Sequence, residues 1–275
     1  MTSLPSLLPS LQVDGVDVFI EGGEGSEAEG KDTIVMIHGW PDTCQLWDAQ
    51  VAFFKGSYRC VRFTLPGFDV SKPRRLVSAD DMVGTIKRIV ETVSPGRPVT
   101  LMIHDWGCIF GGLLAQLHPS LVSRIVAVDV GDASTPEHLA SLSRLARGMV
   151  SAYQGLLSLA WRIGGKFGDG LTRRMATALK APGPLERISS AMNFPYFLLR
   201  SGGYAKYLLT RTGGLGFPML FIYGTAKPFL FHTKAWADKV AAKPGNQVVA
   251  VDCGHWVMHE QTDTFNATVH AWLEK

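Results

Sequence analysis

The chain has 275 residues, 46% hydrophobic and 19% charged, so apolar side chains are ample for a large core and a mainly disordered chain is excluded. The formal net charge of +3, from 27 Lys and Arg against 24 Asp and Glu, is too small for a typical nucleic-acid-binding surface. We therefore expect one compact globular protein whose partner is a small-molecule substrate and not a nucleic acid. Its oligomeric state cannot be inferred from the sequence.

The cysteines and apolar segments predict a cytoplasmic protein without a membrane span. The four cysteines form no Cys-x-x-Cys pair, which favours reduced thiols: Cys44, Cys60, Cys108 and Cys253. The first residues, MTSLPSLLPSLQ, contain two prolines and no basic residue, so they make a poor signal peptide. The longest apolar stretch, residues 149–163, is interrupted by polar side chains and is shorter than the roughly 20 residues that a bilayer requires.

In chain order, the first predicted element is a β-hairpin over residues 11–21, where apolar and polar residues alternate around Asp14-Gly15. Short apolar runs then predict buried strands at 33–38, 58–65, 99–104, 125–129, 218–223 and 247–251. Helical patterns lie between them, at 47–53, 79–92, 110–117, 234–240 and 262–273. This alternation predicts an α/β fold with a mostly parallel sheet, helices on both faces and ligands at the carboxyl ends of the strands.

The alternation stops between residues 132 and 217, where the pattern is helical. We therefore predict a core of residues 1–131 and 218–275 with a helical cap, residues 132–217, inserted after the sixth strand. The cap contains 11 Lys and Arg against four acids, so it carries +7 and the core carries −4. Two interpretations remain open: an ordinary solvated helical surface, or a lid whose positive field favours anionic ligands.

The strongest chemical signal is the segment VTLMIHDWGCIFGG at 99–112, in which a buried strand leads through Asp105 directly into a helix. This is the context of a nucleophile elbow, with an aspartate at the nucleophile position. A carboxylate there can displace a leaving group at a saturated carbon and form an ester that water hydrolyses, which suits epoxides and alkyl halides. The alternative is that Asp105 only caps the helix.

Two further segments follow strands at the same predicted edge. The first, His38-Gly39-Trp40-Pro41, would place the backbone N–H of Trp40 beside that of Trp106, and these two donors would form an oxyanion hole. The second contains His255, after the last strand, which is the expected place for a base that activates water. We include His38 in the predicted substrate and oxyanion region.

These motifs resemble the α/β-hydrolase-fold proteins of the epoxide hydrolase and haloalkane dehalogenase group. The resemblance spans nearly the whole chain, through HGWP at 38–41, HDWG at 104–107, the helical cap and GHWVMHEQTDTF at 254–265, and the epoxide hydrolases are the most similar branch. It implies an eight-stranded α/β-hydrolase fold with a cap after the sixth strand, Asp105 as nucleophile, His255 as base, and no cofactor. The sequence contains no His/Cys spacing typical of a metal site, and no nucleotide-binding Gly motif follows a predicted strand.

The sequence departs from the family pattern at two positions. Ile103 stands where these elbows usually have glycine, and Lys227 stands in the loop where the family most often places the acid that orients the histidine. Some haloalkane dehalogenases carry that acid 24 residues after the nucleophile, which here is Asp129. We therefore predict Asp129 as the acid, with Asp132 as second choice, whereas Asp252 is too close in sequence to His255 to face it well.

Epoxide opening also needs a proton donor for the emerging alkoxide, and the family uses cap tyrosines for this step. Tyr153, followed by Gln, is similar to the first of these tyrosines, and Tyr196 resembles the second. The cap also contains Tyr204 and Tyr207, and any of the four can instead serve only in packing.

Two other functions remain open. A dehalogenase would need halide donors: Trp106 can supply one and the cap residue Trp161 another, but Trp40 occupies the position where that family often has Asn. A non-catalytic binding protein of the same fold is the third interpretation, and Lys227 is its main support. Epoxide hydrolysis fits the motifs best.

Overall fold

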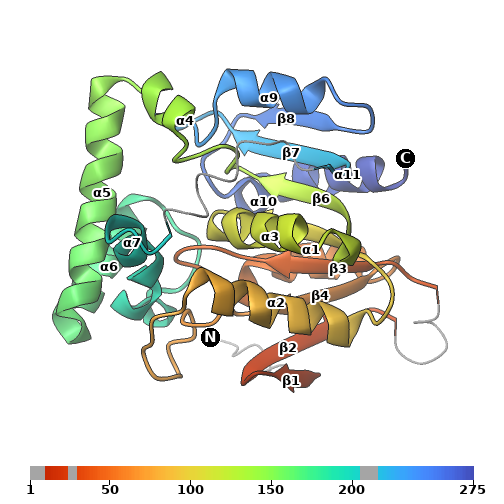
Figure 1. Cartoon of the computed structure of the whole chain (residues 1–275), viewed down its shortest axis with the longest axis horizontal. Coiled ribbons are helices and arrows are strands. Elements are labelled where there is room, and N and C mark those ends of the chain that lie inside the picture. The colour runs from red at the N-terminus through yellow and green to blue at the C-terminus, as the bar shows by residue number, and fades with distance from the viewer. Residues whose placement is uncertain (1–9, 24–29, 205–215) are drawn as a thin grey trace.

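The computed structural model describes residues 10–23, 30–204 and 216–275. In these ranges eight strands form one sheet in the order β1-β2-β4-β3-β5-β6-β7-β8 (Figure 1). The strands are β1 (Leu11–Val13), β2 (Val16–Glu21), β3 (Thr33–Ile37), β4 (Arg59–Phe63), β5 (Val99–His104), β6 (Val122–Val128), β7 (Met219–Gly224) and β8 (Gln247–Val251). The predicted hairpin and all six further predicted strands are present. Strand β8 was predicted to be buried, but it lies at the edge of the sheet with none of its residues fully buried.

The sheet is mixed but mostly parallel, as predicted. Strand β2 pairs antiparallel with β1 and β4, and every pairing from β4 to β8 is parallel. The registers align the strand ends: Ile37 pairs with Ile103, and His104 pairs with Val128. The residues that follow β3, β5 and β6 therefore emerge side by side at one edge, where ligands bind in such sheets.

Helices cover both faces of the sheet. The cluster of buried residues on one face includes α2 and α3, and the cluster on the other includes α1, α10 and α11. Apolar residues of α2 recur at three- and four-residue spacing, and the Ser78 side chain caps this helix by accepting from the N–H of Asp81 at 3.1 Å. The core helices are α1 (Asp48–Phe54), α2 (Ala79–Val93), α3 (Trp106–Leu117), α9 (Lys234–Ala241), α10 (Val257–Glu260) and α11 (Thr262–Leu273), with 3-10 turns η2 (Cys44–Trp47) and η3 (Pro119–Leu121).

The segment between β6 and β7 is helical, as the α/β-hydrolase fold with a cap implies. Figure 1 shows α5, α6 and α7 gathered beyond one end of the sheet, with the long helix α5 at the outer edge. The elements of this cap are α4 (Pro136–Ser141), α5 (Arg144–Ile163), α6 (Gly165–Ala178), η4 (Leu185–Arg187), η5 (Ser190–Asn193) and α7 (Phe194–Arg200). None of the helices in the described ranges has the length and apolar character needed to cross a bilayer.

Two element boundaries differ from the prediction at chemically important positions. Helix α3 begins at Trp106 and not at residue 110, because the chain turns into the helix immediately after Asp105. Strand β6 ends at Val128, one residue before Asp129, whose φ of +67° takes it out of the strand conformation. Both carboxylates therefore sit on sharp turns at the ends of buried strands.

Candidate active site

Asp105 occupies a strained turn between β5 and α3, with φ +51° and ψ −121°. Small residues make the turn possible. A Cβ on Gly39 would lie 2.3 Å from Asp105 Oδ1, and a Cβ on Gly107 would lie 2.3 Å from the Ile37 carbonyl oxygen. Side chains at these two glycines would displace the turn that presents the Asp105 carboxylate.

Ile103, which departs from the usual elbow glycine, is accommodated by a glycine elsewhere. A Cβ on Gly111, one turn into α3, would lie only 2.8 Å from Ile103 Cγ2. The side chain of Ile103 is buried, at 2% exposure. The space that an elbow glycine would leave is therefore filled by isoleucine, and the helix has no side chain at the point of contact.

The predicted oxyanion region lies beside the Asp105 carboxylate. The backbone N–H of Trp40 donates to Asp105 Oδ1 at 2.7 Å. A Cβ on Gly39 would lie 2.5 Å from the backbone nitrogen of Trp106, so the two predicted donor groups belong to segments in close contact. Both segments therefore face the carboxyl group, from the turns after β3 and β5.

His38 lies next to this region but its side chain is engaged in holding the loop. Its Nε2 accepts from the N–H of Leu65 at 2.9 Å, and Nδ1 lies 2.9 Å from the Gly39 carbonyl oxygen. Burial lowers the pKa of His38 to about 4, so the ring is neutral at physiological pH. We assign His38 to positioning the turn that carries Trp40.

His255 lies between the two candidate carboxylates. Its Nδ1 is 2.5 Å from Asp129 Oδ2, and its Nε2 is 3.5 Å from Asp105 Oδ2. Burial alone would lower the pKa of His255, but the charges and hydrogen bonds of Asp129 and Asp105 raise it to about 9. The charged imidazole in turn holds the pKa of Asp105 and that of Asp129 below their usual range, against the opposing effect of burial.

Asp129 is fully buried and has three partners. Besides His255, the Gly224 N–H donates to Oδ1 at 3.0 Å, and the Lys227 ammonium forms an ion pair with the same oxygen. The second-choice acid, Asp132, instead accepts from the Thr233 N–H at 2.7 Å and from its hydroxyl at 2.8 Å, at the start of α9. Asp252 is exposed at the end of β8. The geometry brings Asp129, and neither of the others, to His255.

Two cap tyrosines cover the Asp105 carboxylate. Tyr153 from α5 and Tyr196 from α7 have ring centroids 5.9 Å apart, and both line a cavity with Asp105. Burial raises the pKa of each phenol above its usual value, so both keep their protons. The Tyr204 hydroxyl instead donates to the Val77 carbonyl at 2.8 Å, and Tyr207 lies outside the described residues.

The cavity over Asp105 is small, about 50 Å³, where a water molecule in the liquid occupies roughly 30 Å³. Its wall also contains apolar residues that the sequence did not single out: Ile109, Val130, Leu199 and Phe231. Phe231 lies beside the candidate base, with its ring centroid 5.3 Å from that of His255, because residue 231 bridges to Val130 after β6. Its only sequence signal was its place in the loop after β7.

His104, which precedes Asp105, also contacts the site. Its ring centroid is 4.5 Å from that of His255, and its Nε2 lies 3.2 Å from the His255 carbonyl oxygen. Burial lowers the pKa of His104 to about 3, so it adds no positive charge beside the candidate base. Within the described residues, no group of His, Cys, Asp and Glu side chains is arranged to hold a metal ion.

Of the two candidate halide donors, Trp106 and Trp161, only Trp106 lies at the cavity over Asp105. The Trp40 indole N–H donates to Asn193 Oδ1 at 2.7 Å. Trp161 stacks on Phe197, and its ring is not among those that line the cavity. Of the tryptophans considered for a dehalogenase, only Trp106 lines the cavity.

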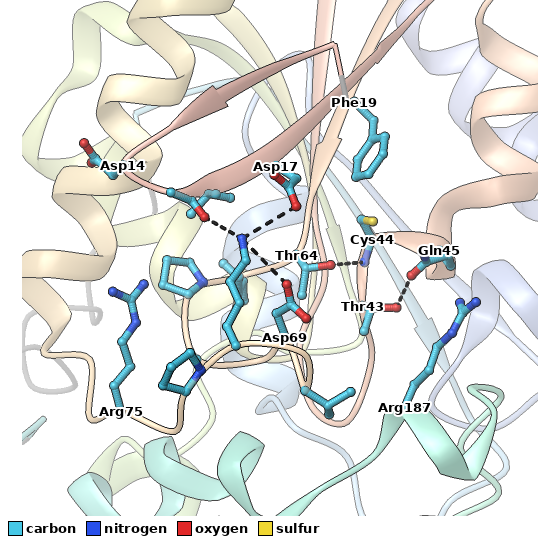
Figure 2. A pocket seen from close by; sticks show the side chains of 18 residues that line it. Asp14, Asp17, Phe19, Thr43, Cys44, Gln45, Thr64, Asp69, Arg75 and Arg187 are labelled. Carbon is cyan, nitrogen blue, oxygen red and sulfur yellow. Dashed lines mark hydrogen bonds and ion pairs between the residues drawn. The ribbon is translucent and has the colours of Figure 1, made fainter. Parts of the chain in front are cut away.

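A larger hollow of about 550 Å³ lies elsewhere, near β2 and the loops after β3 and β4 (Figure 2). Asp17 and Asp69, labelled in Figure 2, each form an ion pair with the Lys72 ammonium, which also donates to the Gly15 carbonyl oxygen. Its wall contains neither Asp105 nor His255. The hollow is therefore separate from the candidate active site.

The similarity of this sequence to known proteins agrees with the observed fold. The sequence profile of the α/β hydrolase fold family matches residues 32–262, so the chain belongs to this family. Over 110 residues it is 32% identical to epoxide hydrolase 2 of Caenorhabditis elegans, covering 39% of this chain and 30% of that enzyme. A longer match, 24% identical and covering 89% of each chain, is to a cis-3-alkyl-4-alkyloxetan-2-one decarboxylase of Xanthomonas campestris. The chain thus matches less than a third of the length of the first curated relative.

Solved epoxide hydrolases share the architecture. A mutant of the Bacillus megaterium enzyme superimposes with a TM-score of 0.75 at 20% identity, covering 96% of this chain and 99% of that chain. Epoxide hydrolase A of Mycobacterium thermoresistibile gives 0.69 at 20% identity, covering 96% and 97%. The protein is therefore an α/β hydrolase distantly related to epoxide hydrolases.

Proposed function

We propose that this protein is a cofactor-independent epoxide hydrolase that opens an epoxide to a vicinal diol through an ester on Asp105. The observation that carries the proposal is the convergence on one small cavity of a carboxylate, a histidine 3.5 Å away and two buried phenols from the cap. A carboxylate, a base and a proton donor are the three groups that this reaction needs.

In the first step, an Asp105 oxygen attacks a ring carbon and the bond from that carbon to the epoxide oxygen breaks. Tyr153 or Tyr196 donates its proton to the emerging alkoxide, which is a poor leaving group without one. The elevated pKa of both phenols keeps them protonated until the alkoxide forms. The product of this step is a hydroxyalkyl ester on Asp105.

In the second step, water cleaves the ester. Esterification removes the negative charge of Asp105, which is one of the causes that raise the pKa of His255. His255 therefore becomes easier to deprotonate when the intermediate forms. Its proton returns to the phenolate that the first step left, and the neutral ring can then take a proton from water. Asp129 stabilises the imidazolium that results, and the Trp40 and Trp106 N–H groups face the oxyanion on the ester carbon. Collapse releases the diol and restores Asp105.

The decisive experiment is a single turnover of excess enzyme with a small terminal alkyl epoxide, matched to the small cavity, in heavy-oxygen water. The proposal expects unlabelled diol from the first turnover and label in the peptide that contains Asp105, because the diol oxygen comes from the carboxylate. His255→Gln should accumulate the ester as a mass increase on the same peptide. Labelled diol in the first turnover, with no ester in His255→Gln, would rule the mechanism out.

A second candidate is suggested by the relative that aligns over 89% of both chains, whose name describes decarboxylation of an oxetan-2-one. Asp105 could open such a strained lactone at its alkyl carbon, releasing a carboxylate that needs no proton from a tyrosine. Loss of carbon dioxide would then expel Asp105 and leave an alkene. Alkene and carbon dioxide from a β-lactone, without diol from any epoxide, would favour this function.

Halide release from haloalkanes or haloacids remains the test of a dehalogenase. The position of Trp161 away from the cavity and the bond from the Trp40 indole to Asn193 give that function little support.

A further inference from the structure

The outer face of the cap carries an apolar stripe that no described part of the protein covers. On α5, apolar residues recur at alternating four- and three-residue spacing, so they lie on one side of the helix. Exposure reaches 76% at Leu145 and 50% at Ile163. The stripe consists of the exposed residues Leu145, Met149, Ala152, Leu159 and Ile163, with the partly exposed Leu156 between them. It continues at Phe167 in the first turn of α6, which is 83% exposed.

The stripe is not needed to hold α5 in place. A different side of this helix buries Ala146, Leu157 and Ala160, and α5 packs on α6 and α7. Tyr153, which lines the cavity, also lies on the packed side. Large exposed apolar side chains that occur singly need no explanation, but a continuous row along a 20-residue helix indicates a contact surface.

Charge identifies the kind of partner. The sequence from α5 through α6, residues 144–178, contains six Lys and Arg and a single acid, Asp169. Asp169 accepts from the N–H and the hydroxyl of Ser190, within the cap. Four of the cations are exposed and make no ion pair with the residues that the structure describes: Arg144, Arg147, Arg162 and Lys166. Arg144 and Arg162 lie along one flank of the stripe, whereas Arg147 lies on the far side of α5. An exposed apolar row flanked by cations without ion-pair partners favours binding to an anionic surface with an apolar interior.

A second copy of the chain fits this face less well. An antiparallel contact between two α5 helices through the stripe would bring Arg144 of one copy near Arg162 of the other, and like charges in contact repel. No carboxylate on α5 could offset this repulsion, because the helix has neither Asp nor Glu.

We propose that the stripe on α5 and Phe167, with the flanking cations, docks on an anionic phospholipid membrane. The apolar side chains would enter the headgroup boundary, and the Arg and Lys side chains would reach the lipid phosphates. The cap would then rest on the bilayer while its packed side covers Asp105, which places the candidate active site near lipid-dissolved substrates.

The test is flotation of the full-length protein with vesicles of phosphatidylcholine, alone or with about a third phosphatidylserine. Binding is expected only to the anionic vesicles and should weaken as salt increases. Leu145→Ser with Phe167→Ser should weaken it about tenfold or more, and so should Arg144→Gln with Arg162→Gln. Matched controls on the core, Leu117→Ser and the pair Lys55→Gln with Lys239→Gln, should bind like the wild type.

Several outcomes would overturn the proposal. One is failure of the wild type to bind the anionic vesicles, and another is that the cap variants bind as well as the controls. A third such outcome is a concentration-dependent dimer, without vesicle binding, that Leu145→Ser with Phe167→Ser abolishes. Circular dichroism and thermal unfolding of every variant show whether reduced vesicle binding is due to the substituted surface or to an unfolded variant. None of the substituted side chains lines the cavity over Asp105, so the readout does not depend on the proposed reaction.

Discussion

The Lys227 ammonium forms a buried ion pair with Asp129, with the lysine side chain 8% exposed and the aspartate 0%. Lys227 stands in the loop where the related enzymes most often have an acid, and at first sight it argues against catalysis. In the structure it contacts the carboxylate oxygen that His255 does not use. The position of Lys227 is therefore compatible with the proposed role of Asp129 as the acid, and it weakens the argument that Lys227 marks a non-catalytic protein.

Lys227→Met should move the acid limb of the kcat profile to higher pH. The charged groups that face His255 are Asp105, Asp129 and, through Asp129, Lys227. Because the Lys227 charge partly offsets that of Asp129, removing it lets Asp129 stabilise the imidazolium more strongly. The pKa of His255 then rises, and less of the neutral base is present at neutral pH. Lys227→Arg keeps the charge and should keep the wild-type limb. An unchanged limb in Lys227→Met would show that the lysine only supports the loop.

Asp129→Asn should separate the two chemical steps. The first step uses Asp105 and the tyrosines, so epoxide should still be consumed once per active site. Hydrolysis should slow by about 10²-fold or more, because the imidazolium loses its stabilising carboxylate. Rapid-quench mass spectrometry should therefore detect the Asp105 ester in this variant. Asp132→Asn is the matched control, since Asp132 bonds to Thr233, and it should turn over without accumulating ester.

Tyr153→Phe and Tyr196→Phe should each lower kcat for epoxides, and the double variant should lose about 10²-fold or more, because general-acid catalysis is removed. Tyr204→Phe is the control: it loses the bond to the Val77 carbonyl and should lower the unfolding temperature without this loss of turnover. A β-lactone or haloalkane would not need the phenol proton. If such a substrate is turned over equally by the wild type and the double variant while epoxides are inert, the proposed reaction is wrong.

The sequence predicted those features of the fold and site that depend on local patterns, and not those that depend on contacts between residues far apart in the chain. Continuous apolar runs located the buried strands, and the chain order of the motifs located Asp105 and His255, because both signals are local. The sequence singled out Tyr153 through the Gln that follows it, but it could not show that the Tyr204 hydroxyl is used in packing, because its contact with the Val77 carbonyl depends on long-range packing. Likewise, the partnership of Lys227 with Asp129 spans 98 residues and depends on the adjacency of β6 and β7.

Stability should fall as the pH drops from about 6.5 toward 4. Burial lowers the pKa of His38 and of His232 to about 4, and that of His104 to about 3, from the usual histidine value of 6.5. The unfolded chain therefore binds protons in this window that the folded chain does not, and protonation favours unfolding. Urea unfolding across the window should show the decrease, and His232→Gln should make it shallower. The control His270→Gln, at an exposed position on α11, should leave the slope unchanged.

The pKa of His255 is shifted in the opposite direction, so its contribution to the free energy of unfolding is lost at alkaline pH and not at acid pH. The pKa of His255 in the folded protein, about 9, lies above the usual histidine value of 6.5. Its contribution to stability is therefore fully present below pH 6.5 and is lost as the pH rises through 9. The difference in unfolding free energy between the wild type and His255→Gln should therefore shrink between these two values. A difference that stays constant across the window would contradict the charged state assigned to His255.

The contact of Ile103 with Gly111 can be tested with a double-mutant cycle. Gly111→Ala would place a Cβ 2.8 Å from Ile103 Cγ2, and we expect it to destabilise the fold by about 1–3 kcal/mol even though alanine is the better helix former. Ile103→Ala alone should cost about 2–5 kcal/mol, because it leaves a cavity in the core. In the double variant the new methyl group enters that cavity, so the combined cost should be smaller than the sum. Additive costs would show that the missing glycine of the elbow is accommodated elsewhere than at Gly111.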